Sequence, residues 1–161
     1  GTHARDKDAI VAVMSLCEVA AYCKKHGKTL WDMMLDVYEK YGYYKESQYT
    51  ITMKGIDGAR QIAEIMNKLR QNPPKAFGSR KVLKFRDYET DRIVDMETGA
   101  ETKTGLPKSN VLYFELPDDE WGCARPSGTE PKIKFYAGIK GTSLEDSAKK
   151  LDDLMEAIKN A

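Results

Sequence analysis

One segment of the chain combines residue types that bind oxyanions. Between two runs that alternate like strands lies the sequence Arg125-Pro126-Ser127-Gly128-Thr129-Glu130-Pro131, called the 125–131 loop below. Arg125 offers a planar fork of donors that matches two phosphate oxygens. Ser127 and Thr129 add hydroxyl donors, and Gly128 permits a positive φ, so that neighbouring backbone N–H groups turn inward as an anion nest. These residue types predict a phosphate-binding loop.

The run that follows the loop adds positive charge. In a strand, Lys132, Lys134 and Tyr136 share one face, and the apolar residues between them share the other. If the two runs pair as a hairpin, Lys134 returns beside Arg125 as a second cation. The residue pattern alone leaves two interpretations open, because a tight β-turn with ordinary surface hydroxyls has the same composition.

The elements before the loop begin with a predicted helical hairpin. Residues 8–25 carry apolar side chains at helical spacing, and Gly27 ends that helix. Thr29 fits an N-cap with Asp32 three residues later, and a second apolar stripe runs to Gly42. Two short helices bury little surface alone. We therefore expect the hairpin to belong to a larger domain.

From about residue 47 the spacing of the apolar residues changes from the helical repeat to the alternation of a strand, and further strands and helices follow. Tyr49, Ile51 and Met53 alternate as a half-buried strand, and a helix centred on residues 62–69 stops before Pro73. Further strands are predicted at Lys81–Tyr88, Val111–Leu116, Glu120–Arg125 and Lys132–Ile139.

The polar stretch between residues 87 and 110 is predicted to form a long hairpin-like connection between two strands. Thr142 and Glu145 predict a capping box for a last helix. Residues 47–161 thus give an α+β fold, an antiparallel sheet with helices on one face. Trp121 is expected to pack near the loop.

Composition excludes several classes of function. The net charge is +1, so no overall field favours nucleic acid or an anionic membrane. No apolar run approaches the roughly 20 residues that a membrane-spanning helix needs. The three cysteines lack metal-ligand spacing and predict reduced thiols in the cytoplasm. His3 and His26 lie far apart, and the acidic residues between 87 and 97 are interleaved with basic ones, so we expect no metal site.

Longer stretches of the sequence resemble one known family. The run Arg-Pro-Ser-Gly-Thr-Glu-Pro-Lys-Ile-Lys-Phe-Tyr from Arg125 resembles the phosphate-binding signature of the α-D-phosphohexomutase superfamily, in its phosphoglucomutase/phosphomannomutase branch. Residues 1–9 resemble the segment after that family's sugar-specificity loop. Residues 106–111 are similar to the bacterial phosphoglucomutases. The resemblance covers essentially the whole chain, and the loop is its most specific part.

The resemblance implies a fold and a division of the chain. Residues 1–45 correspond to the last helices of the third mutase domain. Residues 46–161 correspond to the fourth, phosphate-binding domain, whose fold resembles the TATA-box-binding protein. The chain is then expected to be a C-terminal fragment whose missing N-terminal domains are its partners.

The resemblance also implies a function. Such mutases interconvert hexose 1-phosphate and hexose 6-phosphate through a phosphoserine and a bisphosphorylated intermediate, with Mg²⁺. Arg125, Ser127, Gly128 and Thr129 match the phosphate loop, and Lys134 stands where many relatives have arginine. Residues expected near the active site are Lys7, Arg5 and His3.

Parts of the family's machinery are missing from this sequence. It contains no phosphoserine loop, no aspartate-rich Mg²⁺ loop and no Gly-Glu-x-Ser sugar-reading motif. The isolated chain is therefore expected to bind a phosphosugar without turning it over, and Mg²⁺ is expected to bind outside it. A sister mutase for an amino-sugar or pentose phosphate, or a stand-alone anion-binding module, remains an alternative.

Overall fold

The structure is a computed structural model that describes residues 7–53, 55 and 57–160. The chain divides into two compact units, the first ending at Gly42 and the second starting at Tyr43.

The first unit is the predicted helical hairpin, made of α1 (Ala9–Lys25) and α2 (Leu30–Tyr41). Thr29 and Asp32 form the predicted capping box, because each side chain accepts a hydrogen bond from the other's backbone N–H. α2 ends at Gly42, whose φ of 110° disfavours any other residue. Both helices therefore begin and end where the sequence signals them.

The first unit buries very little of its apolar surface. Among its described residues, only Cys23 is buried. Large apolar side chains stay exposed along both helices, among them Ile10, Val13, Met14, Leu16, Val19, Trp31, Met34 and Val37. Ile10, at 75%, is the most exposed of these. A helix pair whose apolar stripe faces solvent lacks a core of its own.

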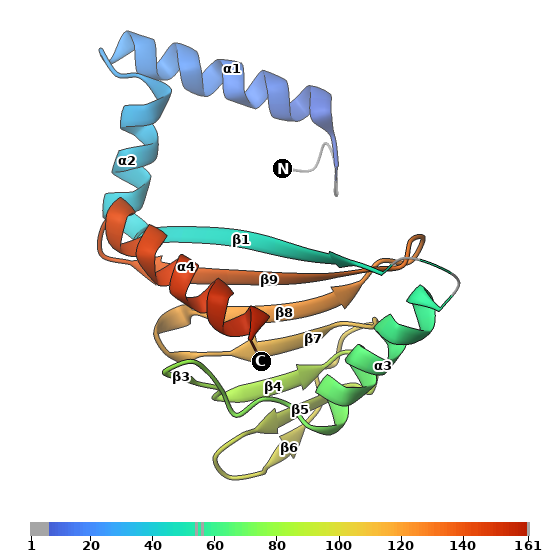
Figure 1. Ribbon diagram of the computed structural model, residues 1–161. Coiled ribbons are helices and arrows are strands. Elements are labelled where there is room, and N and C mark those ends of the chain that lie inside the picture. The colour runs from blue at the N-terminus through green and yellow to red at the C-terminus, as the bar shows by residue number, and fades with distance from the viewer. Residues whose placement is uncertain (1–6, 54, 56, 161) are drawn as a thin grey trace. The chain divides into compact units, whose positions relative to one another are not determined.

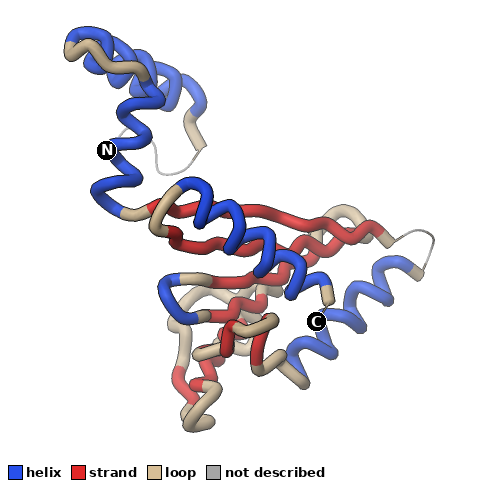
Figure 2. The backbone as a smooth tube through the Cα atoms, turned by 60° about the vertical axis from the view of Figure 1, so that its left-hand side comes forward, coloured by secondary structure: helices blue, strands red, loops and turns tan. Residues whose placement is uncertain are grey.

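The second unit is built on an antiparallel sheet, seven-stranded within the described residues (Figure 1). Across the sheet its strands are β1 (Tyr43–Thr52), β9 (Lys132–Gly141), β8 (Trp121–Pro126), β7 (Leu112–Glu115), β4 (Lys84–Asp87), β5 (Arg92–Asp95) and β6 (Glu101–Thr102). Two helices, α3 (Gly58–Gln71) and α4 (Leu144–Lys159), pack on the same face (Figure 2). The predicted α+β class, with helices on one face, is confirmed.

Alternation along the strands separates the two faces of the sheet. Leu112, Phe114, Ala124 and Ile133 point to the helices and are at most 3% exposed. They form one core with the buried stripes of the two helices, Ile62, Met66, Leu151, Leu154 and Ile158. The other face carries Arg86, Tyr113, Cys123 and Tyr136, and we call it the open face. This face includes Arg125, next to the buried Ala124.

Two predicted strands differ from those observed. The run predicted as one strand, Lys81–Tyr88, contains β3 (Arg80–Lys81), which pairs with β2 (Ala76–Phe77), and β4, which belongs to the main sheet. Between β3 and β4 lies Val82, which is fully buried. β1 starts at Tyr43, about four residues before the predicted change of period, because its first half is polar on both faces and gives no alternation.

The predicted connection between residues 87 and 110 contains ordered strands. β5 and β6 extend the sheet there, and their acidic side chains stabilise turns. Asp95 accepts hydrogen bonds from the backbone N–H and hydroxyl of Thr98, and these bonds lower the pKa of Asp95. Asp91 accepts from Thr104 and Gly105 in the same way. The carboxylates of Asp91 and Asp95 are thus occupied by turn hydrogen bonds.

The caps of α4 differ from the predicted Thr142–Glu145 box. Ser143 is the N-cap and its hydroxyl accepts from the N–H of Asp146. The Asp146 carboxylate in turn accepts from the N–H of Thr142. The N-cap is therefore one residue later than predicted, and the Asp146 carboxylate accepts from the N–H of the residue before the N-cap in place of the reciprocal bond of a capping box.

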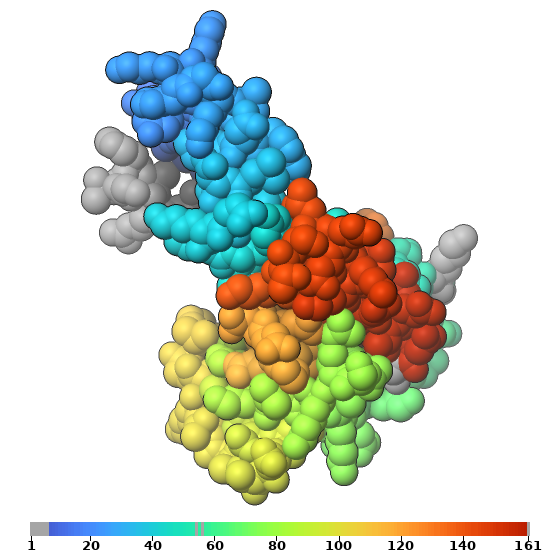
Figure 3. Space-filling view, turned by 90° about the vertical axis from the view of Figure 1, so that its left-hand side faces the viewer, coloured from blue at the N-terminus to red at the C-terminus, as the bar shows by residue number. Residues whose placement is uncertain are grey.

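The β2–β3 hairpin lies against α4. The guanidinium of Arg80 donates to the backbone carbonyl of Lys150 at 3.0 Å and to the Glu120 carboxylate at 2.5 Å. In Figure 3 the light-green surface of this region lies directly beside the red surface of α4. This partly buried ion pair fixes the hairpin over the end of the core.

Candidate functional site

The 125–131 loop is the connection between β8 and β9. Arg125 and Pro126 are the last residues of β8, and Lys132 is the first of β9. The base of the loop is closed by a 2.7 Å hydrogen bond from the Ser127 N–H to the Lys132 carbonyl. The Thr129 N–H donates weakly, at 3.4 Å, to the Ser127 hydroxyl oxygen. The two strands pair as a hairpin, the condition set for bringing Lys134 beside Arg125, and the loop presents both hydroxyls at one end of the sheet.

Gly128 differs from its prediction. Its φ lies outside the left-handed region, and a Cβ built on it meets nothing within 4 Å. The structure therefore does not contain the nest that a positive φ at this position would create. What the glycine contributes is an open approach to the loop, since no side chain stands in front of the backbone.

Arg125 and Lys134 face each other across the β8–β9 ladder on the open face. Directly opposed residues in antiparallel strands have Cβ atoms about 5 Å apart, and like charges there repel. Within the described part of the chain, neither side chain has an ion-pair partner. On the far side of Lys134 the neighbouring strand contributes Thr50, which is uncharged. The two cations therefore form an unbalanced pair at the base of the loop.

The third cation of the loop is balanced. The Lys132 ammonium donates to both carboxylate oxygens of Glu130, at 3.0 and 3.1 Å. Its charge is therefore neutralised within the loop. Because Lys132 is already paired, the candidate anion site consists of Arg125 and Lys134 together with the hydroxyls of the loop.

The loop also borders a groove on the helix-bearing side of the sheet. This groove, of about 470 Å³, is lined by loop residues 126–131, by Ala59, Ala63 and Met66 of α3, and by Asn110. Arg125 and Lys134 are not among its lining residues, because they project from the other face. The structure thus brings Ser127, Gly128 and Thr129 together at the groove, with the cation pair on the opposite side of the loop.

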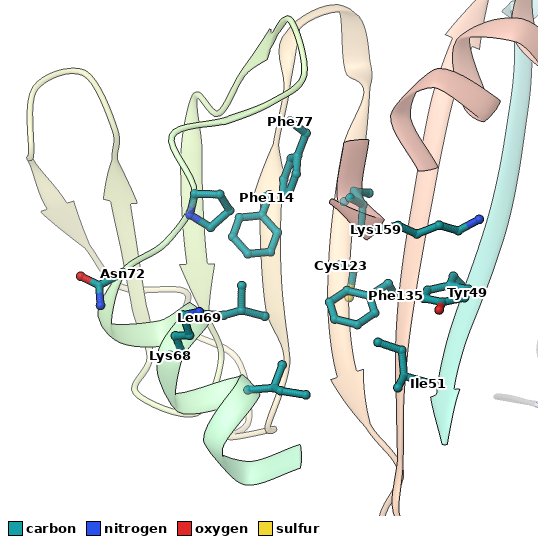
Figure 4. Close-up of a pocket in the computed structure, with 14 residues that line it drawn as sticks. Tyr49, Ile51, Lys68, Leu69, Asn72, Phe77, Phe114, Cys123, Phe135 and Lys159 are labelled. Carbon is teal, nitrogen blue, oxygen red and sulfur yellow. The ribbon is translucent and has the colours of Figure 1, made fainter. Parts of the chain in front are cut away.

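A second, apolar groove lies between α3 and α4 (Figure 4). It holds about 330 Å³, and Leu69, Phe114 and Phe135 point into it. Its two lysines stand at its margin, and Lys159 lies over the Tyr49 ring at 4.9 Å from the centroid. Because polar groups do not converge inside it, this groove lacks the chemistry of a phosphate site.

Cys123 lies two residues before Arg125 on the open face. Burial raises the pKa of its thiol to about 11, against the opposing effect of the Arg125 charge. The thiol is therefore protonated at neutral pH and is not a nucleophile. The residues around the loop consequently bind and orient, with no acid–base pair among the predicted site residues.

The remaining predicted site residues lie in the first unit or before it. Lys7 is described and exposed, directly before α1. His3 and Arg5 lie outside the described residues. Trp121 is at the end of β8 remote from the loop, where its ring stacks on Tyr113 at 5.6 Å. Its expected position near the loop is wrong.

Asn110 is the site residue that the sequence did not single out. Its place in the sequence, just before β7 in a polar stretch, resembles that of any loop asparagine. Only the pairing of β7 with β8 brings it level with the start of the loop. Among the described residues, no cluster of three or more His, Cys, Asp or Glu side chains is arranged to hold a metal ion.

The relatives found by comparison with known proteins belong to one family. No family model matches the chain. The phosphoglucomutases of Staphylococcus aureus strains USA300 and COL are 35% identical to it over 151 residues, which make up 94% of this chain and 27% of each relative. The chain is homologous to the C-terminal part of phosphoglucomutases. It spans about a quarter of the length of these relatives.

A solved structure supports the same fold. The exocytosis-sensitive phosphoprotein parafusin of Paramecium, a phosphoglucomutase in its open form, superposes with a TM-score of 0.55. The match covers 99% of this chain and 28% of parafusin, at 18% identity. This solved structure shows the shared fold, and the S. aureus relatives confirm the predicted resemblance to phosphoglucomutases. In the described residues, no helix is both long and apolar enough to cross a membrane.

Proposed function

We propose that the protein containing this chain interconverts hexose 1-phosphate and hexose 6-phosphate, as a phosphoglucomutase/phosphomannomutase. In this reaction a phosphoryl group passes between a phosphoserine and the sugar through a bisphosphorylated intermediate, with Mg²⁺ bound outside this chain. Residues 46–161 form the fourth domain and hold the phosphate that is not reacting. The phosphate ligands are Arg125, Ser127, Gly128, Thr129 and Lys134.

The observation that carries this proposal is the unbalanced pair of Arg125 and Lys134 at the base of the loop that carries the two hydroxyls. Two opposed cations without a carboxylate destabilise a hairpin. An oxyanion placed against them removes the repulsion and gains charge-assisted hydrogen bonds. A clamp of this kind needs donors and positive charge, and it needs no general acid or base. This matches the neutral thiol of Cys123 and the hydroxyls of the loop.

The first unit supports the proposed division into domains. Its exposed apolar stripe fits the last helices of a third domain that continues in the preceding part of the protein. We assign residues 1–45 to that domain and place Lys7, Arg5 and His3 near the transferring phosphate, where positive charge offsets the developing negative charge. The three unpaired thiols agree with a cytoplasmic location.

A phosphate titration of this chain tests the clamp. Inorganic phosphate should shift the backbone amide signals of Ser127, Gly128 and Thr129 with a Kd on the order of millimolar, since few hydrogen bonds contribute. Arg125→Lys should weaken binding more than Lys134→Arg, because the first removes a planar fork of donors and the second supplies one. Added salt should reduce the affinity, because the cations are solvent-accessible.

Lys149→Arg, on the distant helix α4, exchanges one cation for another as the test variants do and should leave the titration unchanged. If phosphate instead shifts the amide signals of lysine-rich regions uniformly and leaves the signals of Gly128 and Thr129 unchanged, the clamp does not exist. The 125–131 loop would then be an ordinary β-turn.

A further inference from the structure

Asn110 occupies a defined place in the groove beside the 125–131 loop. It precedes β7, in which Leu112 pairs with Ala124 of β8. Continuing this register places Asn110 level with Pro126, the first of the loop residues that line the groove. The local backbone is fixed by hydrogen bonds from the Tyr88 N–H to the Val111 carbonyl and from the Ser109 N–H to the Tyr88 carbonyl.

The orientation of the Asn110 side chain is determined by Arg70. The Nη2 of Arg70 lies 2.8 Å from the Oδ1 of Asn110. A guanidinium has donors and no acceptor, so the atom that faces it must be the carbonyl oxygen. The Nδ2 of Asn110 therefore points away from Arg70 with two N–H groups. Within the described residues, no acceptor bonds to this Nδ2.

Arg70 is itself held by a buried carboxylate. Asp87 is only 2% exposed and accepts from the Arg70 Nε at 2.9 Å. Asp87 also accepts from the Thr90 hydroxyl and the Glu89 N–H. A carboxylate this deeply buried holds its partner in one geometry, because losing the pair would leave an unpaired charge in the core. Asp87 thus fixes Arg70, and Arg70 fixes Asn110.

We propose that the Nδ2 of Asn110 is a further ligand of the phosphate held by the 125–131 loop. The amide reaches the anion from the groove side, while Arg125 and Lys134 act from the open face. The phosphate is then clamped from both faces at the ends of β7, β8 and β9. Asp87 and Arg70 do not touch the anion and act as positioning residues. This inference rests on the proposed phosphate-clamping function.

The wild-type chain provides the direct measurement. During titration with inorganic phosphate, the side-chain NH₂ signals of Asn110 should shift along the same binding curve as the Thr129 amide. The NH₂ signals of Asn67 serve as the internal reference. Asn67 also contacts Arg70, at 3.4 Å, but it does not line the groove.

Substitution by aspartate tests the role of the donor. Asn110→Asp keeps the shape and the acceptor for Arg70, removes the two N–H donors and adds a negative charge. It should weaken phosphate binding by about tenfold or more. Asn67→Asp adds the same charge to the same arginine outside the groove and should stay within about twofold of the wild type. Matching circular dichroism spectra confirm that both variants fold.

The outcomes separate this inference from the proposed function. If the Thr129 amide responds while the Asn110 NH₂ signals stay still and Asn110→Asp binds like the wild type, the clamp exists and the role of Asn110 is wrong. If neither Thr129 nor Asn110 responds to phosphate, both proposals are wrong. If Asn110→Asp and Asn67→Asp weaken binding equally, the effect is one of net charge, and the specific role of Asn110 is again overturned.

Discussion

Gly128, in the β8–β9 connection, and Gly138, in β9, have opposite surroundings. A Cβ built on Gly138 would lie 2.4 Å from two ring atoms of Trp121, its partner across the strands. A Cβ on Gly128 would meet no atom within 4 Å. One glycine is required by packing, whereas the other leaves room for a ligand.

We predict that Gly138→Ala destabilises the second unit by about 2 kcal/mol. The added methyl must displace the Trp121 indole from its stack on Tyr113, and the strand backbone beneath it cannot move away. Urea denaturation followed by circular dichroism measures the loss. Gly128→Ala is the matched control and should leave the midpoint unchanged, since its φ and its surroundings accept a methyl group. Equal midpoints for the two variants would contradict this account of Gly138.

At the scale of elements, the two units differ in how they bury apolar surface. α1 and α2 keep their apolar side chains exposed, whereas α3 and α4 bury Ile62, Met66, Leu151 and Leu154 against the sheet. Local opening of an element costs least where few apolar contacts are lost.

We therefore predict that amide hydrogens of α1 and α2 exchange faster than those of β8 and β9 in the isolated chain. Hydrogen exchange followed by mass spectrometry or NMR measures the two groups directly. The matched comparison is α4, a helix of similar length to α1 that is packed on the sheet and should exchange slowly. Slow exchange throughout α1 and α2 would show that these helices have a stabilising partner that burial in the first unit does not reveal.

The sequence predicted the elements wherever local chemistry decides them. The α2 capping box, the α+β class and the β8–β9 hairpin follow from spacing and alternation, which are properties of neighbouring residues. The early start of β1 was missed because an edge strand that is polar on both faces carries no alternation. The division of residues 80–87 into β3 and β4 was missed because strand partners are a tertiary choice, and Val82 and Leu83 are both apolar.

The same limit applies to the candidate site. Arg125, Ser127 and Thr129 lie within five residues of one another, so their composition suggested an anion-binding loop, with an ordinary β-turn as the alternative. The orientation of the Asn110 side chain depends on Arg70 and Asp87, which are 40 and 23 residues away from it in the sequence. No local pattern encodes such a chain of contacts. A positive φ at Gly128 was a permitted conformation, and a permitted conformation need not be the one that packing selects.

For the whole molecule, we predict that the chain of 161 residues does not convert glucose 1-phosphate to glucose 6-phosphate. The proposed clamp would hold one phosphate, and the sequence contains no phosphoserine loop for transfer. A coupled assay with glucose 6-phosphate dehydrogenase measures the product, with a full-length mutase as the positive control. Turnover that persists through repurification, and that falls with Arg125→Ala, would show that this chain carries chemistry of its own.

The pairing of β1 with β9 joins the first and last strands of the second unit, Tyr43 to Gly141. Within the described residues, β1 lies at the edge of the sheet and pairs with β9 alone. During synthesis on the ribosome, β1 must therefore wait for nearly the whole unit to emerge before it finds a partner, and its unpaired edge is open to other nascent chains meanwhile. A premature stop codon before Lys132 would release a product with that edge permanently bare, and such truncated products should be early targets of chaperones and proteases.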